Sequence, residues 1–502
     1  MSMTIESAIG VSVLPEVQSF LNEGPLKSFI GGEWVKTSTG ATFRTLDPGS
    51  GTELAEVHAG DKSDVDQAVQ AAQTAFDKSG WSTLSPHERG VYLHRLADLV
   101  EQHAEIMAQL ESLDCGKIHA QAQSDIATFV STLRYYTNMA LHIQRRLPLA
   151  VAGHEAHSSL GPYGPCGFIF PWNFPFLLVG WGISPALAAG NTVVIKPAED
   201  TPLSTLYFTK LVKEAGIPGG VINVVAGHGE TTGAAVASHP GFKRMSFTGS
   251  PEVGRMVGKA AGENLCPTKL ELGGKGAAVI FDDVDIEDTA QKLAGAITLH
   301  TGQVCCTATR WIVQESILNK LADSCAKKLQ EVEIGHEMND GSQMGPVVSK
   351  KQQDRVLSYL KRGAEGGAEF MLEGGPAEVK GKDGGFYVKP AMMAGGPDNA
   401  ACIEEIFGPV TYLMPFKNED EAIDLVNRSS YGLANSVWSA NLDRCQRVAE
   451  SMVAGNSWIN AHNVFPQGVP YAGVNLSGVG GGVNSPETYY DYLRPKSIVR
   501  PL

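Results

Sequence analysis

Cysteine is scarce in this sequence, with eight residues among 502. That number is far too small for a disulfide scaffold, and only Cys305 and Cys306 lie close together along the chain. The N-terminus also lacks a basic segment followed by an apolar core, so no signal peptide is expected. Both absences predict reduced thiols and a cytoplasmic protein.

Basic residues are outnumbered, with 40 Lys and Arg against 54 Asp and Glu, which gives a net charge of −14. A field of that sign repels phosphate backbones, and we expect no nucleic acid partner. Charged residues make up only 19% of the chain and hydrophobic ones 43%, which indicates large buried cores rather than disorder. At about 150 residues per domain, the length predicts about three domains.

One apolar stretch is long enough to be tested as a bilayer span, residues 168–190, which carry no charge. Pro171, Pro175 and Pro185 interrupt it, and each removes a backbone donor and restricts helix geometry. We therefore expect a buried loop that leads into a core helix, and no membrane partner.

Several kinds of catalytic machinery are missing. The sequence has no H-E-x-x-H, C-x-x-C, G-x-S-x-G or G-x4-G-K-[ST] motif, which argues against the corresponding metalloprotease, redox, hydrolase and NTPase chemistry. The thirteen histidines are scattered without metal-ligand spacing, so no metal site is predicted.

Short apolar runs alternate with helical segments between about residues 165 and 282. This alternation is typical of a parallel sheet with helices on both faces, and nucleotides bind at the carboxyl ends of such strands. The strands expected here are 166–170, 192–196, 221–225, 243–247 and 276–281.

A second alternation begins after residue 283 and predicts another α/β domain, with strands at 309–314 and 410–416. The N-terminal part is typical of turns and amphipathic helices, one over 63–78 and another over 86–116, which a capping box opens. The tail, 489–501, is expected to be an extended strand that either pads a sheet edge or pairs with another subunit.

The segment Gly302-Gln303-Val304-Cys305-Cys306-Thr307 lies in a loop expected between a helix and a strand. A thiol is a strong nucleophile only as the thiolate, and a cysteine with an ordinary pKa of about 8.5 is mostly protonated at neutral pH. A catalytic cysteine therefore needs a dipole or a base nearby, and a buried structural role is the common alternative. The local pattern does not choose between Cys305 and Cys306.

The segment Leu270-Glu271-Leu272-Gly273-Gly274-Lys275 places a carboxylate between two leucines. Partial desolvation would raise the pKa of Glu271 toward the range that is useful for a general base. The alternative is a solvated glutamate at a strand end.

Two other segments could contact phosphate or ribose. Residues 247–254 follow an apolar strand and open a helix, where glycine admits a phosphate, although tight turns also use glycine for steric reasons alone. Lys196-Pro197-Ala198-Glu199 could hold ribose hydroxyls or only cap a helix.

Together and in this order, these segments resemble the aldehyde dehydrogenase superfamily. The matching segments are Pro171-Trp172-Asn173-Phe174-Pro175, 196–199, 247–250, 270–275, 302–305 and 404–410. The resemblance implies an α/β fold: a Rossmann-like coenzyme domain (1–140 and 160–272), a catalytic domain (273–480) and a small β oligomerisation element (141–159 and 481–502). It also implies a homodimer or homotetramer.

The resemblance implies a role for three residues in the reaction. Cys305, two places after Gly-Gln, would attack the aldehyde carbon, and Cys306 would be a bystander. The amide of Asn173 and the N–H of Cys305 would stabilise the oxyanion, hydride would pass to the coenzyme, and Glu271 would activate the water that hydrolyses the thioester.

The resemblance also assigns the coenzyme contacts. Lys196 and Glu199 would hold the adenosine ribose, Gly249 and Ser250 the pyrophosphate, and Glu405 and Phe407 the nicotinamide ribose and ring. A carboxylate at Glu199 favours a free 2′-hydroxyl, which predicts NAD. The other coenzyme contacts implied are Phe170, Pro171, Trp172, Ala198, Phe247, Val253, Leu272 and Gly273.

The substrate is expected to enter an apolar tunnel. The matching positions are Phe174, Leu178, Trp181, Phe465 and Tyr471, and four of the five are aromatic. Such a lining favours an aromatic aldehyde, and residues 14–20 and 484–499 resemble the phenylacetaldehyde dehydrogenase branch. A broad-specificity aliphatic enzyme is the alternative. Less favoured are an acyl-CoA-forming relative, against which Glu271 argues, and a catalytically quiet binding protein.

The sequence departs from the pattern at a proposed proton relay. Many relatives carry Lys after the tryptophan that matches Trp181, and an Arg-Glu pair before the tail, whereas here the positions are Gly182, Gly481 and Gly482. The loss of both the Lys and the Glu is physically coherent, because either charged side chain alone would be buried without a partner of opposite charge. Proton exit from Glu271 is then expected to use water or backbone carbonyls, and introducing Lys at 182 together with Glu at 482 would test this.

Overall fold

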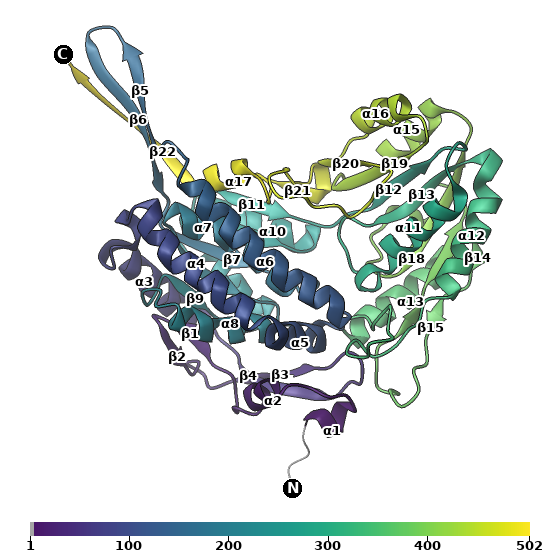
Figure 1. Ribbon diagram of the computed structural model, residues 1–502, viewed down its shortest axis with the longest axis horizontal. Helices are drawn as coiled ribbons and strands as arrows, with labels where there is room; N and C mark the ends of the chain where they lie inside the picture. Colours follow the sequence, from purple (N-terminus) through teal and green to yellow (C-terminus); the bar gives the residue numbers. More distant parts are fainter. Residues whose placement is uncertain (1–4) are drawn as a thin grey trace.

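Two parallel-stranded sheets form the body of the protein, and both are covered by helices (Figure 1). The structure, a computed structural model, describes residues 5–502. The expected α/β class is confirmed.

The first sheet has the order β2-β1-β9-β8-β7-β10-β11-β21, and strands β7 to β11 run parallel. Both β7 and β8 are buried over their whole length, which explains why residues 166–169 and 193–195 do not alternate with polar residues. The bounds are β1 Ser28–Ile30, β2 Glu33–Val35, β7 Pro165–Ile169, β8 Thr192–Lys196, β9 Ile222–Val224, β10 Arg244–Thr248, β11 Thr268–Glu271 and β21 Gly478–Val479.

Helices cover the faces of this sheet and form the largest hydrophobic core with it. The helix expected over 86–116 is in fact two, because His103 leaves the helical conformation and its ring nitrogen hydrogen-bonds Tyr207 Oη at 2.8 Å. The main bounds are α2 Pro15–Leu21, α3 Lys62–Lys78, α4 Pro86–Gln102, α5 Ala104–Cys115, α6 His119–Ala140, α7 Pro175–Ala189, α8 Leu203–Glu214, α9 Ala234–Ser238 and α10 Pro251–Glu263. The hairpin β3 (Thr42–Leu46) and β4 (Glu53–His58) lies in the N-terminal part, where we expected mainly turns and amphipathic helices.

The second sheet has the order β14-β17-β18-β13-β12-β19-β20. The alternation of strands and helices placed its strand β12 (Gly276–Ile280) in the first sheet, which is wrong, because the chain crosses between the sheets at Gly273 and Gly274. The bounds implied by the resemblance, with a catalytic domain over 273–480, include β12 in that domain. The other strands are β13 Ala308–Gln314, β14 Glu369–Leu372, β17 Ala391–Ala394, β18 Val410–Phe416, β19 Ala434–Trp438 and β20 Asn456–Ile459. Its helices are α11 Ile286–Thr298, α12 Leu318–Gln330, α13 Lys350–Glu365, α15 Glu419–Asn427 and α16 Leu442–Ser451.

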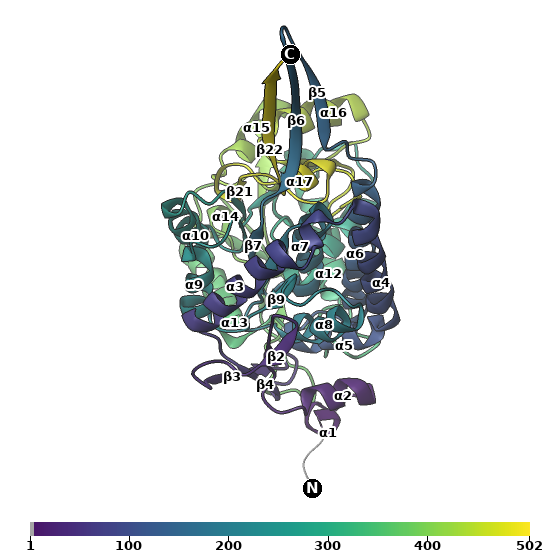
Figure 2. The same ribbon diagram turned by 90° about the vertical axis from the view of Figure 1, so that its left-hand side faces the viewer.

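A three-stranded sheet projects from the body (Figures 1 and 2). It consists of β5 (Arg146–Val151), β6 (His154–Pro162) and the tail strand β22 (Leu493–Pro501), which pairs antiparallel with β6 of the same chain. Before the tail, β21 lies in the range expected for the catalytic domain but pairs with β11 of the first sheet. Helix α17 (Pro486–Tyr490) then packs on α7. Among residues 5–502, no helix combines the length and apolarity that a membrane crossing requires.

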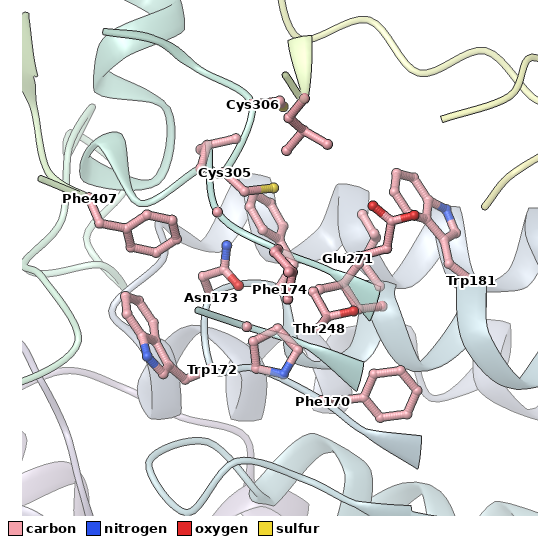
Figure 3. Close-up of a pocket in the computed structure, with 18 of the residues that line it drawn as sticks. Phe170, Trp172, Asn173, Phe174, Trp181, Thr248, Glu271, Cys305, Cys306 and Phe407 are labelled. Atoms are coloured by element: carbon pink, nitrogen blue, oxygen red, sulfur yellow. The ribbon is translucent and has the colours of Figure 1, made fainter. Parts of the chain in front are cut away.

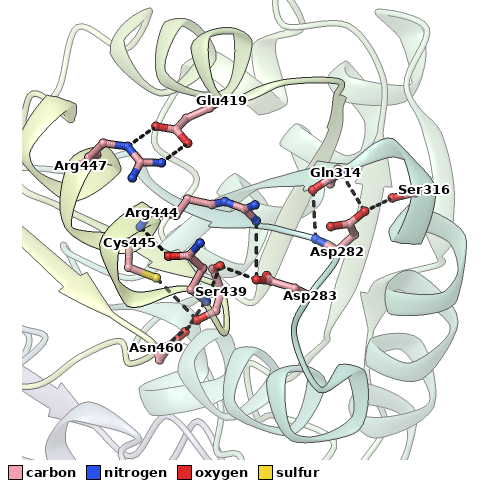
Figure 4. Close-up of polar contacts among 11 residues, drawn as sticks. Asp282, Asp283, Gln314, Ser316, Glu419, Ser439, Arg444, Cys445, Arg447 and Asn460 are labelled. Atoms are coloured by element: carbon pink, nitrogen blue, oxygen red, sulfur yellow. Dashed lines mark hydrogen bonds and ion pairs between the residues drawn. The ribbon is translucent and has the colours of Figure 1, made fainter.

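Polar side chains join the carboxyl ends of four strands in the second sheet (Figure 4). Asn460, after β20, accepts the N–H of Ser439 and donates to its carbonyl oxygen, each at 3.0 Å. Ser439, after β19, donates to Asp283 beyond β12 at 2.9 Å, and Asp282 and Gln314 of β13 exchange two hydrogen bonds.

Replacing Asn460 tests this connection. Asn460→Ala removes two hydrogen bonds, which are worth about 1–3 kcal/mol together. It also places alanine at a φ of +51°, where asparagine and glycine are better tolerated. We expect thermal unfolding to shift down by a few degrees, and Asn460→Gly, which loses the same bonds without the strain, to shift less. Equal transitions in the parent and both variants would contradict this account.

Candidate active site

A cavity of about 710 Å³ lies where the carboxyl ends of β7, β10 and β11 meet the loops of the second sheet. Parallel strands bring their carboxyl ends to one edge, so segments far apart in the sequence converge there. Of the predicted residues, the following line the cavity: Phe170, Pro171, Trp172, Asn173, Phe174, Leu178, Trp181, Gly249, Ser250, Glu271, Leu272, Gly273, Cys305, Glu405, Phe407, Phe465 and Tyr471. Lys196, Ala198, Glu199, Phe247 and Val253 lie outside the lining.

Both cysteines line the cavity, but Cys305 is half-buried and presents its sulfur there (Figure 3), whereas Cys306 is buried and its Sγ lies 3.5 Å from Asn463 Oδ1. The Sγ of Cys305 lies 3.6 Å from Tyr471 Oη. A hydrogen bond from Cys306 lowers the pKa of the Cys305 thiol; Tyr471 adds to this effect, and burial opposes it. Burial raises the pKa of Cys306, which is 1% exposed. The structure thus distinguishes two residues that the local sequence could not.

The loop that carries Cys305 is held in an unusual conformation. His300 and Thr301 have φ values of +44° and +56°, and Gly302 follows at +71°. A Cβ at Gly302 would lie 2.3 Å from the backbone of Gly408, and one at Gly274 would lie 2.0 Å from the carbonyl oxygen of Cys305. Glycine at 302 and 274 therefore allows the three chain segments to meet at the nucleophile.

Glu271 ends β11 and is 7% exposed. Within the described part of the chain, neither carboxylate oxygen has a hydrogen-bond partner. Burial raises the pKa of Glu271 well above its ordinary value, and the charge of Lys269 partly offsets this. A buried carboxylate of raised pKa that faces the cavity has the properties of a general base.

Asn173 lies in the loop between β7 and α7 and is 4% exposed. Its Nδ2 donates to the carbonyl oxygen of Gln303 at 3.0 Å, which orients the side chain beside the Cys305 loop (Figure 3). An amide nitrogen carries two protons, so one remains for an oxygen atom in the cavity.

Glu405 and Phe407 enter the cavity from the second sheet. The rings of Phe407 and Trp172 meet edge to face with centroids 5.2 Å apart. Glu405 Oε1 accepts the N–H of Gly274 at 2.7 Å, and a Cβ at Gly273 would lie 2.4 Å from the Glu405 carboxylate. Burial raises the pKa of Glu405 to about 7.

Lys196 and Glu199 form an ion pair of 2.7 Å at the end of β8, beside β7. Glu199 also accepts the N–H of Gly229 at 3.1 Å. Ser250 follows β10, the strand on the other side of β7, and caps α10 by accepting the N–H of Val253. A Cβ at Gly249 would lie 2.5 Å from the Phe247 ring. Gly249 and Ser250 line the cavity, whereas Lys196 and Glu199 lie at the same edge of the sheet outside the lining.

The predicted substrate residues form one aromatic cluster. Centroids of the Trp181, Phe465 and Tyr471 rings lie 5.4–5.8 Å apart. Phe174 and Leu178 pack against the same cluster, which also includes Cys305. An apolar wall of this kind excludes water and favours aromatic or alkyl groups next to the thiol.

Sequence reasoning missed several polar residues of the cavity. Lys351, Gln352 and Arg355 of the α13 region line it, and Gln352 Nε2 donates to the carbonyl oxygen of Phe407 at 2.7 Å. Lys269 lines it from β11, a strand that we did not predict. Alternation in 268–271 could have placed Lys269 and Glu271 on one face of a strand.

Neighbouring atoms fill the space beside Gly182 and Gly482, two of the positions at which the sequence departs from the family pattern. A Cβ at Gly182 would lie 2.7 Å from Phe170 Cζ, and one at Gly482 would lie 2.5 Å from the carbonyl oxygen of Tyr471. Introducing Lys and Glu there would displace Phe170 and the Tyr471 segment, so that exchange is not a clean test of proton exit.

A buried group of three side chains lies elsewhere, in Asp47, His336 and Glu337, with potential ligand atoms within 4.8 Å of one another. His336 Nε2 lies 3.1 Å from Asp47, and its Nδ1 accepts the N–H of Met338. This tautomer carries its proton on Nε2 and points it at Asp47, so hydrogen bonding orients the imidazole, whereas the Glu337 oxygens have no hydrogen-bond partner among residues 5–502.

Comparisons with known proteins agree with this geometry. The model of the aldehyde dehydrogenase family matches residues 34–498. Aldehyde dehydrogenase family 2 member B4 of Arabidopsis thaliana, a mitochondrial protein, is 40% identical over 479 residues, 94% of this chain and 88% of the relative. The mitochondrial benzaldehyde dehydrogenase of Antirrhinum majus is 38% identical over 479 residues, 95% and 89% of the two chains.

Solved structures agree as well. The NAD+ complex of an aldehyde dehydrogenase from Bacillus cereus matches with a TM-score of 0.94 at 37% identity, covering 98% of this chain and 99% of that chain. The family match and the extent of these similarities show that the chain belongs to the aldehyde dehydrogenase family.

Proposed function

We propose that the protein oxidises an aldehyde to the carboxylic acid with NAD, through a thioester on Cys305. The observation that carries this proposal is the convergence of Cys305, Glu271 and Asn173 on one cavity. The thiol has a lowered pKa and the buried carboxylate a raised one, which suits a nucleophile and a base respectively.

The residues around the cavity fit a dinucleotide. Ser250 at the N-terminus of α10, a helix of 13 residues, offers backbone N–H groups and a positive dipole end to a pyrophosphate. Glu199 and Glu405 would accept hydrogen bonds from the two ribose diols, and a carboxylate at Glu199 would repel a 2′-phosphate. Trp172 and Phe407 would border the nicotinamide. Bound NAD supplies the hydride acceptor.

In the first half of the reaction, the Cys305 thiolate bonds to the aldehyde carbon, and Asn173 donates to the resulting oxyanion. The carbonyl re-forms as hydride leaves the same carbon, and a thioester remains on Cys305. In the second half, Glu271 takes a proton from water as the water oxygen bonds to the thioester carbon. The carbon–sulfur bond then breaks, which releases the acid and the Cys305 thiolate.

We infer an aromatic aldehyde of the phenylacetaldehyde type as the preferred substrate, because the Trp181, Phe465 and Tyr471 rings lie next to the thiol. Initial rates of NADH formation with phenylacetaldehyde, benzaldehyde, hexanal and betaine aldehyde test both levels of the proposal. NADH formation with none of them would refute the oxidation itself. Faster turnover of hexanal than of phenylacetaldehyde would refute only the aromatic preference.

Phe465 offers a test by substitution. Phe465→Leu keeps the wall apolar but removes the edge-to-face contacts, which are worth about 1 kcal/mol. We expect kcat/KM for phenylacetaldehyde to fall about fivefold and that for hexanal to change about twofold or less. Equal losses for the two aldehydes would contradict recognition by the ring.

We also propose that the sheet β5-β6-β22 joins subunits in a homodimer or homotetramer. All six β5 residues are exposed, and three of them, Leu147, Leu149 and Val151, are large apolar side chains at alternating positions. An apolar edge strand of this kind is typical of subunit contacts. Light scattering of the purified protein tests this, and a monomer would refute it.

Eight free cysteines fit a reducing compartment, which supports a cytoplasmic location.

A further inference from the structure

Lys269 is a buried lysine at the wall of the active-site cavity. It precedes Glu271 by two residues in β11, so the two side chains lie on the same face of the sheet. Ser246 and Thr248, which pair with them in β10, also line the cavity, which confirms that this face is directed toward it. Lys269 is 1% exposed.

Burying an ammonium group without a close counterion is costly. Within residues 5–502, no carboxylate oxygen lies within 4.0 Å of Lys269 Nζ, and its hydrogen bond goes to the carbonyl oxygen of Gly482 at 3.4 Å. Its nitrogen also lies 5.7 Å from the centroid of the Tyr492 ring. A residue that only filled space here could be apolar, so the amine calls for a chemical explanation.

Charged groups lead from this amine toward the surface. Glu271 faces Lys269 from the same strand, Arg244 from β10, and Asp491 from the segment after α17. Arg244 lies 3.5 Å from Asp491, and the side chain of Asp491 is 30% exposed. Lys269 therefore stands between a buried carboxylate and a partly exposed one.

The proposed role of Glu271 creates a need for such a group. Each hydrolysis would leave on Glu271 a proton that must depart before the next turnover. Both Glu271 oxygens are buried without a hydrogen-bond partner among the residues that the structure describes. Phe168 and Phe170, stacked 5.7 Å apart, fill the space beside Gly182.

We propose that Lys269 takes the proton from Glu271 after each hydrolysis and releases it toward Asp491 and solvent. This inference rests on the proposed function of Glu271 as the base. Lys269 acts through Glu271 and does not touch the substrate. The Gly482 carbonyl oxygen accepts a hydrogen bond from the amine and orients it.

The proton balance is simple. Glu271 removes one proton from water while the water oxygen bonds to the thioester carbon. The Lys269 ammonium gives its own proton to Asp491 or to solvent, and the neutral amine then accepts the proton of the Glu271 carboxyl. One proton leaves per cycle, and nothing is oxidised or reduced in this step. The hydrogen bond of Lys269 goes to Gly482 rather than to Glu271, so water must carry the proton between the two groups.

The electrostatics are suited to this exchange. Burial lowers the pKa of Lys269 to about 8, although Glu271 opposes that effect, and burial raises the pKa of Glu271. The two groups therefore approach each other in proton affinity and titrate as a coupled pair. A lysine of ordinary pKa would hold its proton too tightly at neutral pH to act in this way.

The test compares Lys269→Met and Lys269→Arg with the parent enzyme, using phenylacetaldehyde and NAD. Methionine keeps the volume without the amine, and arginine keeps the charge but does not release a proton. In both variants we expect a full burst of one NADH per active site, followed by steady turnover about tenfold or more below that of the parent. The rise of kcat with pH near 8 should also disappear.

Lys259→Met is the matched control. Lys259 is exposed on α10, so this substitution removes the same charge outside the cavity. It should retain the parent's turnover and pH profile. Parent-like turnover and pH dependence in Lys269→Met, or parent-like turnover in Lys269→Arg, would overturn the inference. Loss of the burst itself would do so too, since it would place Lys269 in the first half-reaction. Failure of the proposed function is distinguishable, because the parent would then form no NADH.

Discussion

Cys305→Ala is expected to lower NADH formation by about 10⁴-fold or more while NAD binding persists. Without the sulfur no thiohemiacetal forms, and hydride cannot leave an aldehyde carbon that remains planar. The measurement is the initial rate with a saturating aldehyde, accompanied by NAD titration through the fluorescence of the tryptophans, one of which, Trp172, borders the cavity.

The adjacent residue is the matched comparison. Cys306→Ala keeps the nucleophile but removes the hydrogen bond that lowers the pKa of Cys305. Since the thiolate would then form at higher pH, we expect the pH profile of the burst to move to higher pH, with a loss of about tenfold or less at neutral pH. If Cys305→Ala formed NADH within tenfold of the parent's rate, or if Cys306→Ala were inactive, Cys305 would not be the nucleophile.

Glu271→Gln should separate the two halves of the reaction. Glutamine has the same shape but cannot take a proton, so hydrolysis should slow by about 10²–10⁴-fold. Hydride transfer does not need this base, and one NADH per active site should still appear as a rapid burst. Stopped-flow absorbance at a high enzyme concentration measures both phases.

The pH dependence of the parent gives an independent check. Only the carboxylate form of Glu271 is a base, and burial raises its pKa. The hydrolysis rate should therefore increase as the pH rises through that elevated value, and this increase should be absent in Glu271→Gln. If the variant kept the parent's steady rate, or if its burst vanished together with turnover, Glu271 would not be the base of the second step.

Much of this site followed from the sequence because its parts are local. Turns between strand and helix are defined by glycine and proline, and resemblance to a known family supplied the roles of Cys305, Glu271 and Asn173. The structure brings these three residues to one cavity. Their roles remain predictions until the substitutions above are measured.

Other features depend on contacts that no local pattern contains. The strand β12 was assigned to the wrong sheet because an apolar run does not reveal which neighbour it pairs with. His103, at which the expected helix divides, hydrogen-bonds Tyr207, which lies 104 residues away in sequence. The local pattern left Cys305 and Cys306 open and the family resemblance favoured Cys305; the burial of Cys306, which is 1% exposed, agrees with that choice. Lys269 was missed because β11 is only four residues long and too short to be recognised.

Trapping the intermediate tests the central claim most directly. Glu271→Gln is mixed with phenylacetaldehyde and NAD, quenched in acid during the burst and digested, and the peptides are analysed by mass spectrometry with fragmentation between residues 305 and 306. The account predicts one phenylacetyl group on Cys305 and none on Cys306, in proportion to the NADH formed. NADH formation without an acyl group on Cys305 would contradict it.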